Sequence, residues 1–178
     1  MKLLKILFVM SFCTVGINAQ TTNFKHDWDI KYREHDIQFT SNKKTPIPFS
    51  TNGEPQAIMF MGAHALEDSE KNNLIEIVND EIAVIRKEYS IDEYLEEDFE
   101  ANDNIVSYFE KLNNVEIAVI KYRINGFIGG ETIMPRSVRH ILFIHNDKLW
   151  ISSLIVLFGE DQDNVRDDQM TFIKAILK

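Results

Sequence analysis

The chain of 178 residues contains one cysteine, Cys13, and this residue lies inside an apolar stretch near the N-terminus. Once that stretch is removed, as argued below, no thiol remains, which excludes disulfide bonds and cysteine-based catalysis. Lipidation of Cys13 is disfavoured because Phe12, a bulky aromatic, stands where a lipoprotein signal needs a small residue. We therefore expect stability to come from packing, in line with a hydrophobic content of 44%.

Positive charge is also scarce. Lys and Arg number 19 against 28 Asp and Glu, so the formal net charge is −9. A nucleic-acid backbone or an anionic membrane would be repelled and is excluded as the main partner. A basic protein or a cation is the partner class that this charge favours, although solvation of the surface explains it without any partner.

The N-terminus has the pattern of a secretory signal peptide. Met1–Ala19 carries Lys2 and Lys5 ahead of the apolar run Ile6–Val15, and a small residue precedes the predicted cut between Ala19 and Gln20. The run is too short to anchor the chain across a bilayer. We predict export to the periplasm or the medium, a mature charge of about −11, and one domain over residues 20–178.

No motif predicts a metal, a cofactor or a nucleophile. The histidines are scattered (His26, His35, His64, His140 and His145), and the last two have an odd offset that places them on opposite faces of a strand. No serine has a Gly-x-Ser-x-Gly context or is placed near a histidine, and Ser152 and Ser153 are interpreted as small residues packed under a helix. Gly126, Gly129 and Gly130 introduce no helix and so form no phosphate loop.

The acidic segment Asp161–Asp168 matches a calcium loop only in part. Asp161 and Asp163 fit the first two ligand positions, but Val165 replaces the third, and the turn glycine and the closing glutamate are missing. Capping of a helix by Asp161 or Asp163 explains the same residues. Calcium-dependent structure here stays an open, weaker alternative.

The first half of the chain predicts mainly strands. Trp28–Tyr32 and His35–Thr40 alternate in polarity, Ser41–Pro55 is a loop rich in Pro and Gly, and Gln56–Gly62 is a buried strand. Asn72–Tyr89 is ambiguous, because its apolar residues follow helical spacing but are mostly β-branched around Asn79-Asp80. We favour a strand hairpin there.

A short acidic helix is predicted over Ser90–Asn102. Ser90-Ile91-Asp92-Glu93 has the form of a capping box, and Ile91, Tyr94, Leu95 and Phe99 supply an apolar stripe. The opposite face is acidic and is our candidate binding surface for a basic partner; it comprises Asp92, Glu93, Glu96, Glu97 and Glu100.

The second half predicts antiparallel strands and a closing helix. Val115–Ile124 alternates with period two between turn signals, and Gly126–Ser137 is interpreted as a loop. Val138–His145 and Leu149–Phe158 form a hairpin with Asn146-Asp147 as its turn, and Asp161–Lys178 is a terminal helix. The predicted fold is α+β, an antiparallel β-sheet covered by the short acidic helix and the C-terminal helix in an α/β/α sandwich-like arrangement.

The order of these elements resembles a known family. A signal peptide and early strands precede Ser90-Ile91-Asp92-Glu93-Tyr94-Leu95, a long strand follows Asn113-Asn114, and the hairpin Arg139–Phe158 and a helix close the chain. This order is similar to that of the PsbP/Mog1/DcrB-type α/β/α sandwich over residues 36–177. The resemblance implies a non-enzymatic accessory, chaperone-like or binding module, and it brings no shared catalytic residues.

Two functional hypotheses follow. The first is an exported, non-catalytic binding module that acts on a protein partner, with a periplasmic immunity protein against a basic toxin as a specific form. The second is an exported hydrolase whose site assembles only in three dimensions. A concave pocket that gathers a histidine with carboxylates of perturbed acidity would favour the hydrolase.

Overall fold

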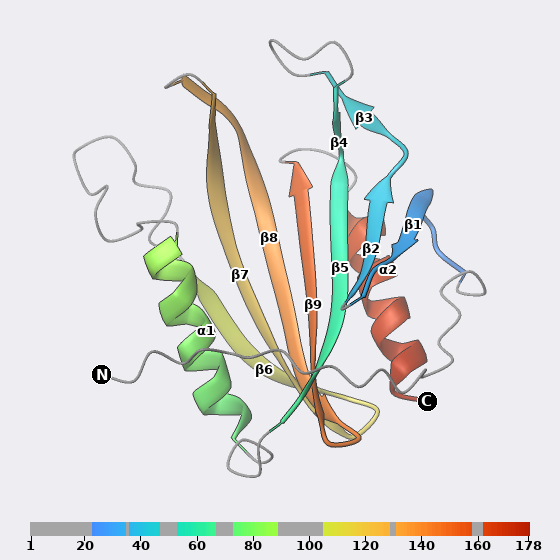
Figure 1. Ribbon diagram of the computed structural model, residues 1–178, viewed down its shortest axis with the longest axis vertical. Coiled ribbons are helices and arrows are strands. Elements are labelled where there is room, and N and C mark those ends of the chain that lie inside the picture. The colour runs from blue at the N-terminus through green and yellow to red at the C-terminus, as the bar shows by residue number, and fades with distance from the viewer. Residues whose placement is uncertain are drawn as a thin grey trace.

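A computed structural model describes residues 23–34, 36–46, 53–66, 73–88, 105–128, 131–157 and 162–178 (Figure 1). Its elements in chain order are β1 (Trp28–Tyr32), β2 (Asp36–Ser41), β3 (Lys44–Thr45), β4 (Glu54–Pro55), β5 (Ala57–Ala65), α1 (Leu74–Glu88), β6 (Val106–Leu112), β7 (Val115–Ile128), β8 (Glu131–His145), β9 (Lys148–Leu157) and α2 (Gln162–Ile176). Neither helix of the described residues has the length and hydrophobicity needed to span a membrane.

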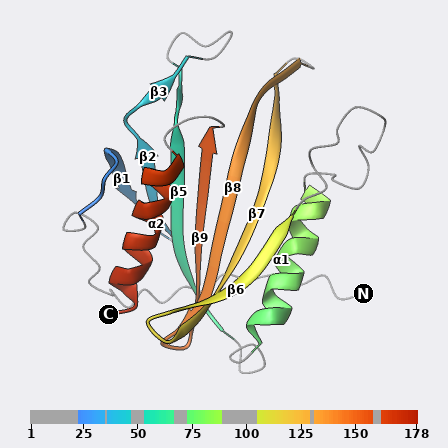
Figure 2. The same ribbon diagram turned by 180° about the vertical axis from the view of Figure 1, so that it is seen from behind.

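Seven of the strands form one antiparallel sheet in the order β1-β2-β5-β9-β8-β7-β6. The two helices lie on opposite faces of this sheet, α1 in front of it in Figure 1 and α2 in front of it in the reversed view of Figure 2. The α+β fold expected from the sequence is therefore confirmed. The predicted acidic helix Ser90–Asn102 lies outside the described residues.

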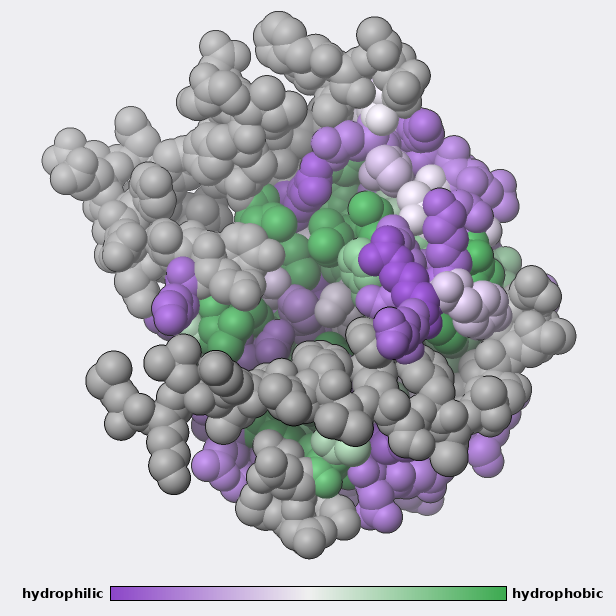
Figure 3. Space-filling model, viewed as in Figure 1, coloured by the Kyte–Doolittle hydropathy of each residue, from purple (hydrophilic) through white to green (hydrophobic). Residues whose placement is uncertain are grey.

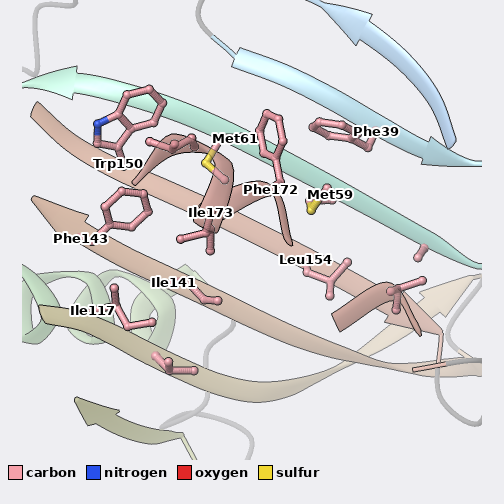
Figure 4. Packing of buried hydrophobic residues seen from close by; sticks show 14 of the residues in the cluster. Phe39, Met59, Met61, Ile117, Ile141, Phe143, Trp150, Leu154, Phe172 and Ile173 are labelled. Carbon is pink, nitrogen blue, oxygen red and sulfur yellow. The ribbon is translucent and has the colours of Figure 1, made fainter. Parts of the chain in front are cut away.

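The larger core lies on the face that α2 covers, here called the α2 face. Alternate residues of the central strands point into it, and the rings of Phe39 and Phe172 meet edge to face with centroids 5.1 Å apart. Phe143 and Trp150 stack at the other end of this core, and Ile173 of α2 packs among them (Figure 4). Because side chains alternate along a strand, the same strands carry a second apolar set to the opposite face.

That opposite face, here called the α1 face, holds a smaller core. α1 packs mainly on β7 and β8. Leu74, Val78 and Ile85 of the helix are buried with Ala118, Ile120, Tyr122, Val138 and Leu142 of the sheet.

The prediction of a strand hairpin over Asn72–Tyr89 is wrong, because residues 74–88 form α1. The β propensity of the isoleucines and valines is overridden by burial of a stripe at helical spacing. Asn73 adds a start signal, since its Oδ1 accepts a hydrogen bond from the Glu76 amide at 3.2 Å and its side-chain amide bonds the Glu76 carboxylate. This arrangement caps the first turn and could have been recognised as Asn-x-x-Glu.

The predicted loop Gly126–Ser137 is also wrong. β7 continues to Ile128 and β8 begins at Glu131, and the pairing shifts register between Asn125 and Phe127. The shift is an irregularity of the bulge type, which lets one long hairpin absorb residues that otherwise end strands. The expected loop Ser41–Pro55 likewise contains a small ladder, in which β3 pairs with β4.

The turn predictions at Asn113-Asn114 and Asn146-Asp147 are confirmed. All four residues have positive φ, between 50° and 65°. Two consecutive residues of this conformation match the twist of the flanking strands. These short turns set the register of β6 with β7 and of β8 with β9.

Candidate functional site

The five acidic residues selected from the sequence, Asp92, Glu93, Glu96, Glu97 and Glu100, lie outside the described residues. Their role in binding stays a prediction. The described part of the chain instead brings together two polar clusters and one apolar surface that sequence reasoning did not select.

The first cluster is a chain of three side chains on the α1 face. His140 of β8 lies between Tyr122 of β7 and Ser153 of β9. The Tyr122 hydroxyl is 2.7 Å from Nε2 of His140, and the Ser153 hydroxyl is 2.9 Å from Nδ1. One ring nitrogen carries the proton, so one hydroxyl donates to the ring and the other accepts from it.

Burial lowers the pKa of His140 from 6.5 to about 4, because the charged imidazolium loses solvation. The ring is therefore neutral at pH 7 and can act as a proton acceptor. The Tyr122 and His140 rings lie parallel with centroids 5.4 Å apart. Among the described residues, no carboxylate hydrogen-bonds this imidazole, so the convergence of a histidine with acids that would favour a hydrolase is not seen there.

The surroundings of Ser153 are those of a regular sheet. This residue pairs with His140 on one side and with Phe60 on the other, in the middle of β9. The serine nucleophile of an α/β-hydrolase sits on a sharp turn beside free backbone amides that bind the oxyanion. Since both neighbours of β9 are strands, the amides near Ser153 serve the sheet, and the cluster is better described as a satisfied polar network.

The interpretation of Ser152 and Ser153 as small residues packed under a helix is right for Ser152 and wrong for Ser153. Ser152 does lie beneath α2, where its hydroxyl accepts a hydrogen bond at 2.9 Å from the buried side-chain amide of Gln169. Ser153 points to the other face and meets His140. The two-residue turn at Asn146-Asp147 already implied this contact, because counting outward from it pairs 140 with 153.

The second cluster joins the start of the described chain to α2. Asp168 is fully buried and accepts hydrogen bonds from the backbone amides of Lys25 at 2.7 Å and His26 at 2.8 Å, and from the indole of Trp28 at 2.9 Å. His26 in turn bonds Ser41 through Nε2 at 2.6 Å. Asp168, the last residue of the segment considered as a calcium loop, is thus used as an internal hydrogen-bond acceptor.

Asp161 and Asp163 are the two residues that fit a calcium loop in the sequence. Asp161 lies outside the described residues, and Asp163 stands in the first turn of α2 with Arg166 at 3.9 Å. Among the described residues, no three His, Cys, Asp or Glu side chains lie close enough together to hold a metal ion.

An apolar surface remains on the α1 face beside the helix. Ile58 and Phe60 of β5 and Ile151 and Ile155 of β9 point to this face and are only half-buried. We call these four residues the open face. Figure 3 shows hydrophobic residues gathered over the middle of this side of the molecule.

No protein-family model and no curated protein matches this sequence. Several solved structures are similar in part, among them the following two. A Bacteroides thetaiotaomicron VPI-5482 protein matches over 82% of this chain at 11% identity with a TM-score of 0.46, and this chain spans 41% of its length. A Pseudomonas aeruginosa protein of unknown function, PA94, matches over 85% of this chain and 94% of its own length, at 8% identity with a TM-score of 0.44.

Proposed function

We propose that this chain is an exported, non-catalytic module that binds an apolar, positively flanked segment of another protein on its open face. The observation that carries the proposal is the set of half-buried side chains Ile58, Phe60, Ile151 and Ile155 beside α1. Aliphatic and aromatic side chains left partly in water gain free energy when a partner covers them, at roughly 25 cal/mol per Å² of apolar area.

Charge supports the choice of partner. The net charge of −9 attracts basic proteins over several ångströms and repels nucleic acids and anionic lipids. The sequence of Met1–Ala19 supports export, and an exported binder of basic proteins includes the specific case of an immunity protein that neutralises a basic toxin. His140 fits a binding role because both of its nitrogens are already bonded within the sheet.

The experiment is affinity capture from the native cell envelope with matched variants. Phe60→Lys places a charge in the open face, and Ile75→Lys makes the same charge change on α1, where Ile75 is 60% exposed. We expect wild type and Ile75→Lys to retain one basic protein that Phe60→Lys loses. Circular dichroism checks that Phe60→Lys is folded.

Capture is then followed by calorimetry with the purified pair. Burial of the open face predicts a negative heat-capacity change on binding that is smaller for a folded Ile155→Ser variant. Equal retention of the captured protein by Phe60→Lys and wild type, or a heat-capacity change near zero, would refute the assignment of the open face.

The Ser153–His140 hydrogen bond favours a second candidate function, an exported hydrolase that uses Ser153 as nucleophile. A fluorophosphonate probe labels activated serines and distinguishes the two functions. Labelling of wild type that disappears in Ser153→Ala would establish the hydrolase and contradict a purely binding role. We expect no labelling at Ser153, because the central strand offers no oxyanion site.

A further inference from the structure

Two positive side chains face each other directly on the α2 face. Lys121 of β7 and Arg139 of β8 are cross-strand partners in the ladder and point to the same side of the sheet. Like charges placed opposite each other in a sheet are destabilising. In an acidic chain with 28 carboxylate residues, such a pair without a direct ion pair among the described residues needs an explanation.

Neither cation has a carboxylate partner within the described residues. The Lys121 ammonium lies over the ring of Tyr108, 4.9 Å from its centroid. Arg139 donates from Nη2 to the sulfur of Met170 at 3.5 Å, and its Nε is buried with no hydrogen-bond partner in the described part of the chain. A guanidinium has five N–H donors, and a thioether is a weak acceptor for one of them.

Burial lowers the pKa of Arg139, and the neighbouring Arg166 of α2 lowers it further, whereas Tyr108 and Glu110 raise it. The contribution of Tyr108 includes a side-chain hydrogen bond with the guanidinium, and burial is the larger effect. Asp167 is nearby, but its carboxylate is bonded to the Lys25 ammonium at 2.6 Å. Partly buried charges in proteins are normally paired, because an unpaired one loses much of its solvation.

We propose that Lys121, Arg139 and the Tyr108 hydroxyl form a binding site for an oxyanion, a phosphate or a carboxylate group, at the junction of β6, β7, β8 and α2. Arg139 supplies a forked donor that matches two oxygens of such a group, and Lys121 supplies a second positive charge. Arg166 adds to the positive potential from the helix. This site lies on the face opposite the open face and does not depend on the function proposed above.

The test follows the Nε–Hε resonance of Arg139 in the full-length protein by ¹⁵N NMR during titration with inorganic phosphate and, separately, with acetate. Sodium chloride at matched ionic strength is the reference for screening. We expect a saturable shift with at least one of the two oxyanions, and the larger response identifies phosphate or carboxylate as the native chemistry.

Two lysine variants test whether the oxyanion binds at Lys121 and Arg139 rather than at any exposed lysine. Lys121→Met keeps the packing on Tyr108 and removes the charge, and it should weaken the affinity about tenfold, the effect of losing one charge-assisted hydrogen bond. Lys31→Met is the matched control, because Lys31 is an exposed lysine of β1 that pairs with Asp29 at 3.5 Å, and it should leave the titration unchanged.

The melting temperature gives a second, independent measurement of oxyanion binding by the same proteins. Phosphate or acetate should raise the melting temperature of wild type and of Lys31→Met by more than that of Lys121→Met at the same concentration. The proposal is overturned if neither oxyanion shifts the Arg139 resonance beyond chloride, or if Lys121→Met responds as strongly as wild type.

Discussion

Replacement of Asp168 by Asn should destabilise the protein far more than its small change in size suggests. The wild-type carboxylate accepts three hydrogen bonds, two from backbone amides at Lys25 and His26 and one from the indole of Trp28, and it is fully buried. An amide keeps one acceptor oxygen and turns an N–H₂ group toward a donor that it cannot satisfy.

The magnitude follows from these contacts. A hydrogen bond to a charged group contributes about 1.5–3 kcal/mol, and a buried donor left unpaired costs about 1–3 kcal/mol. Because the three bonds are coupled through one carboxylate, we expect a total loss of about 3 kcal/mol rather than their sum. With a urea dependence of about 2 kcal/mol per M, the unfolding midpoint should fall by about 1.5 M.

The assay is equilibrium urea unfolding followed by circular dichroism, with the two indole N–H resonances as local probes. The Trp28 resonance should move in Asp168→Asn, whereas that of Trp150, which donates to the His145 carbonyl at 3.2 Å, should not. Asp167→Asn is the control, because Asp167 is exposed and only its pairing with Lys25 is lost.

The control should unfold near the wild-type midpoint, since exposed ion pairs contribute little. If Asp168→Asn also unfolds within about 0.5 kcal/mol of wild type, the carboxylate does not hold the N-terminal segment to α2 and the reasoning fails.

Three further predictions concern the buried His140, the turn at Asp147 and the N-terminus of the exported protein. Because the pKa of His140 is about 4 in the folded chain and near 6.5 when unfolded, the unfolded state binds more protons between these values. Stability should thus fall by up to about 3 kcal/mol as the pH drops from 6.5 to 4, and unfolding curves of His140→Gln should lack this component. Asp147→Ala should cost about 1 kcal/mol in chemical denaturation because φ is +57°, whereas Asp147→Gly should cost nothing; equal effects would contradict the turn assignment. Mass spectrometry of the exported protein should show Gln20 as its first residue, and an intact N-terminus would refute cleavage there.

Local patterns of short range were enough to predict much of the sheet. The alternation in Trp28–Tyr32 and Val115–Ile124, and the turns at Asn113-Asn114 and Asn146-Asp147, are confirmed because each depends on neighbouring residues only. The terminal helix is confirmed for the same reason, since its charges and apolar stripe repeat within a few turns.

Where one segment fits both a helical and a strand pattern, its sequence alone could not decide between the two structures. The β-branched segment that forms α1 satisfies both helical and strand patterns, and burial of Leu74, Val78 and Ile85 against β7 and β8 decides between them. The bulge near Asn125 was equally undecided from local patterns, because Gly126 and Pro135, residue types that often end strands, are accommodated within paired strands here.

The sequence by itself determined the charge, the absence of thiols beyond Cys13 and the antiparallel α+β class, because these depend on composition and on patterns within about ten residues. Apart from the His140–Ser153 contact, which the turn at Asn146-Asp147 implied, only the tertiary structure decided which polar groups meet. Asp168 reaches residues about 140 positions away, and Lys121 faces Arg139 without a carboxylate partner among the described residues. Such contacts depend on strand order and on where each helix lies on the sheet, and no local pattern encodes either.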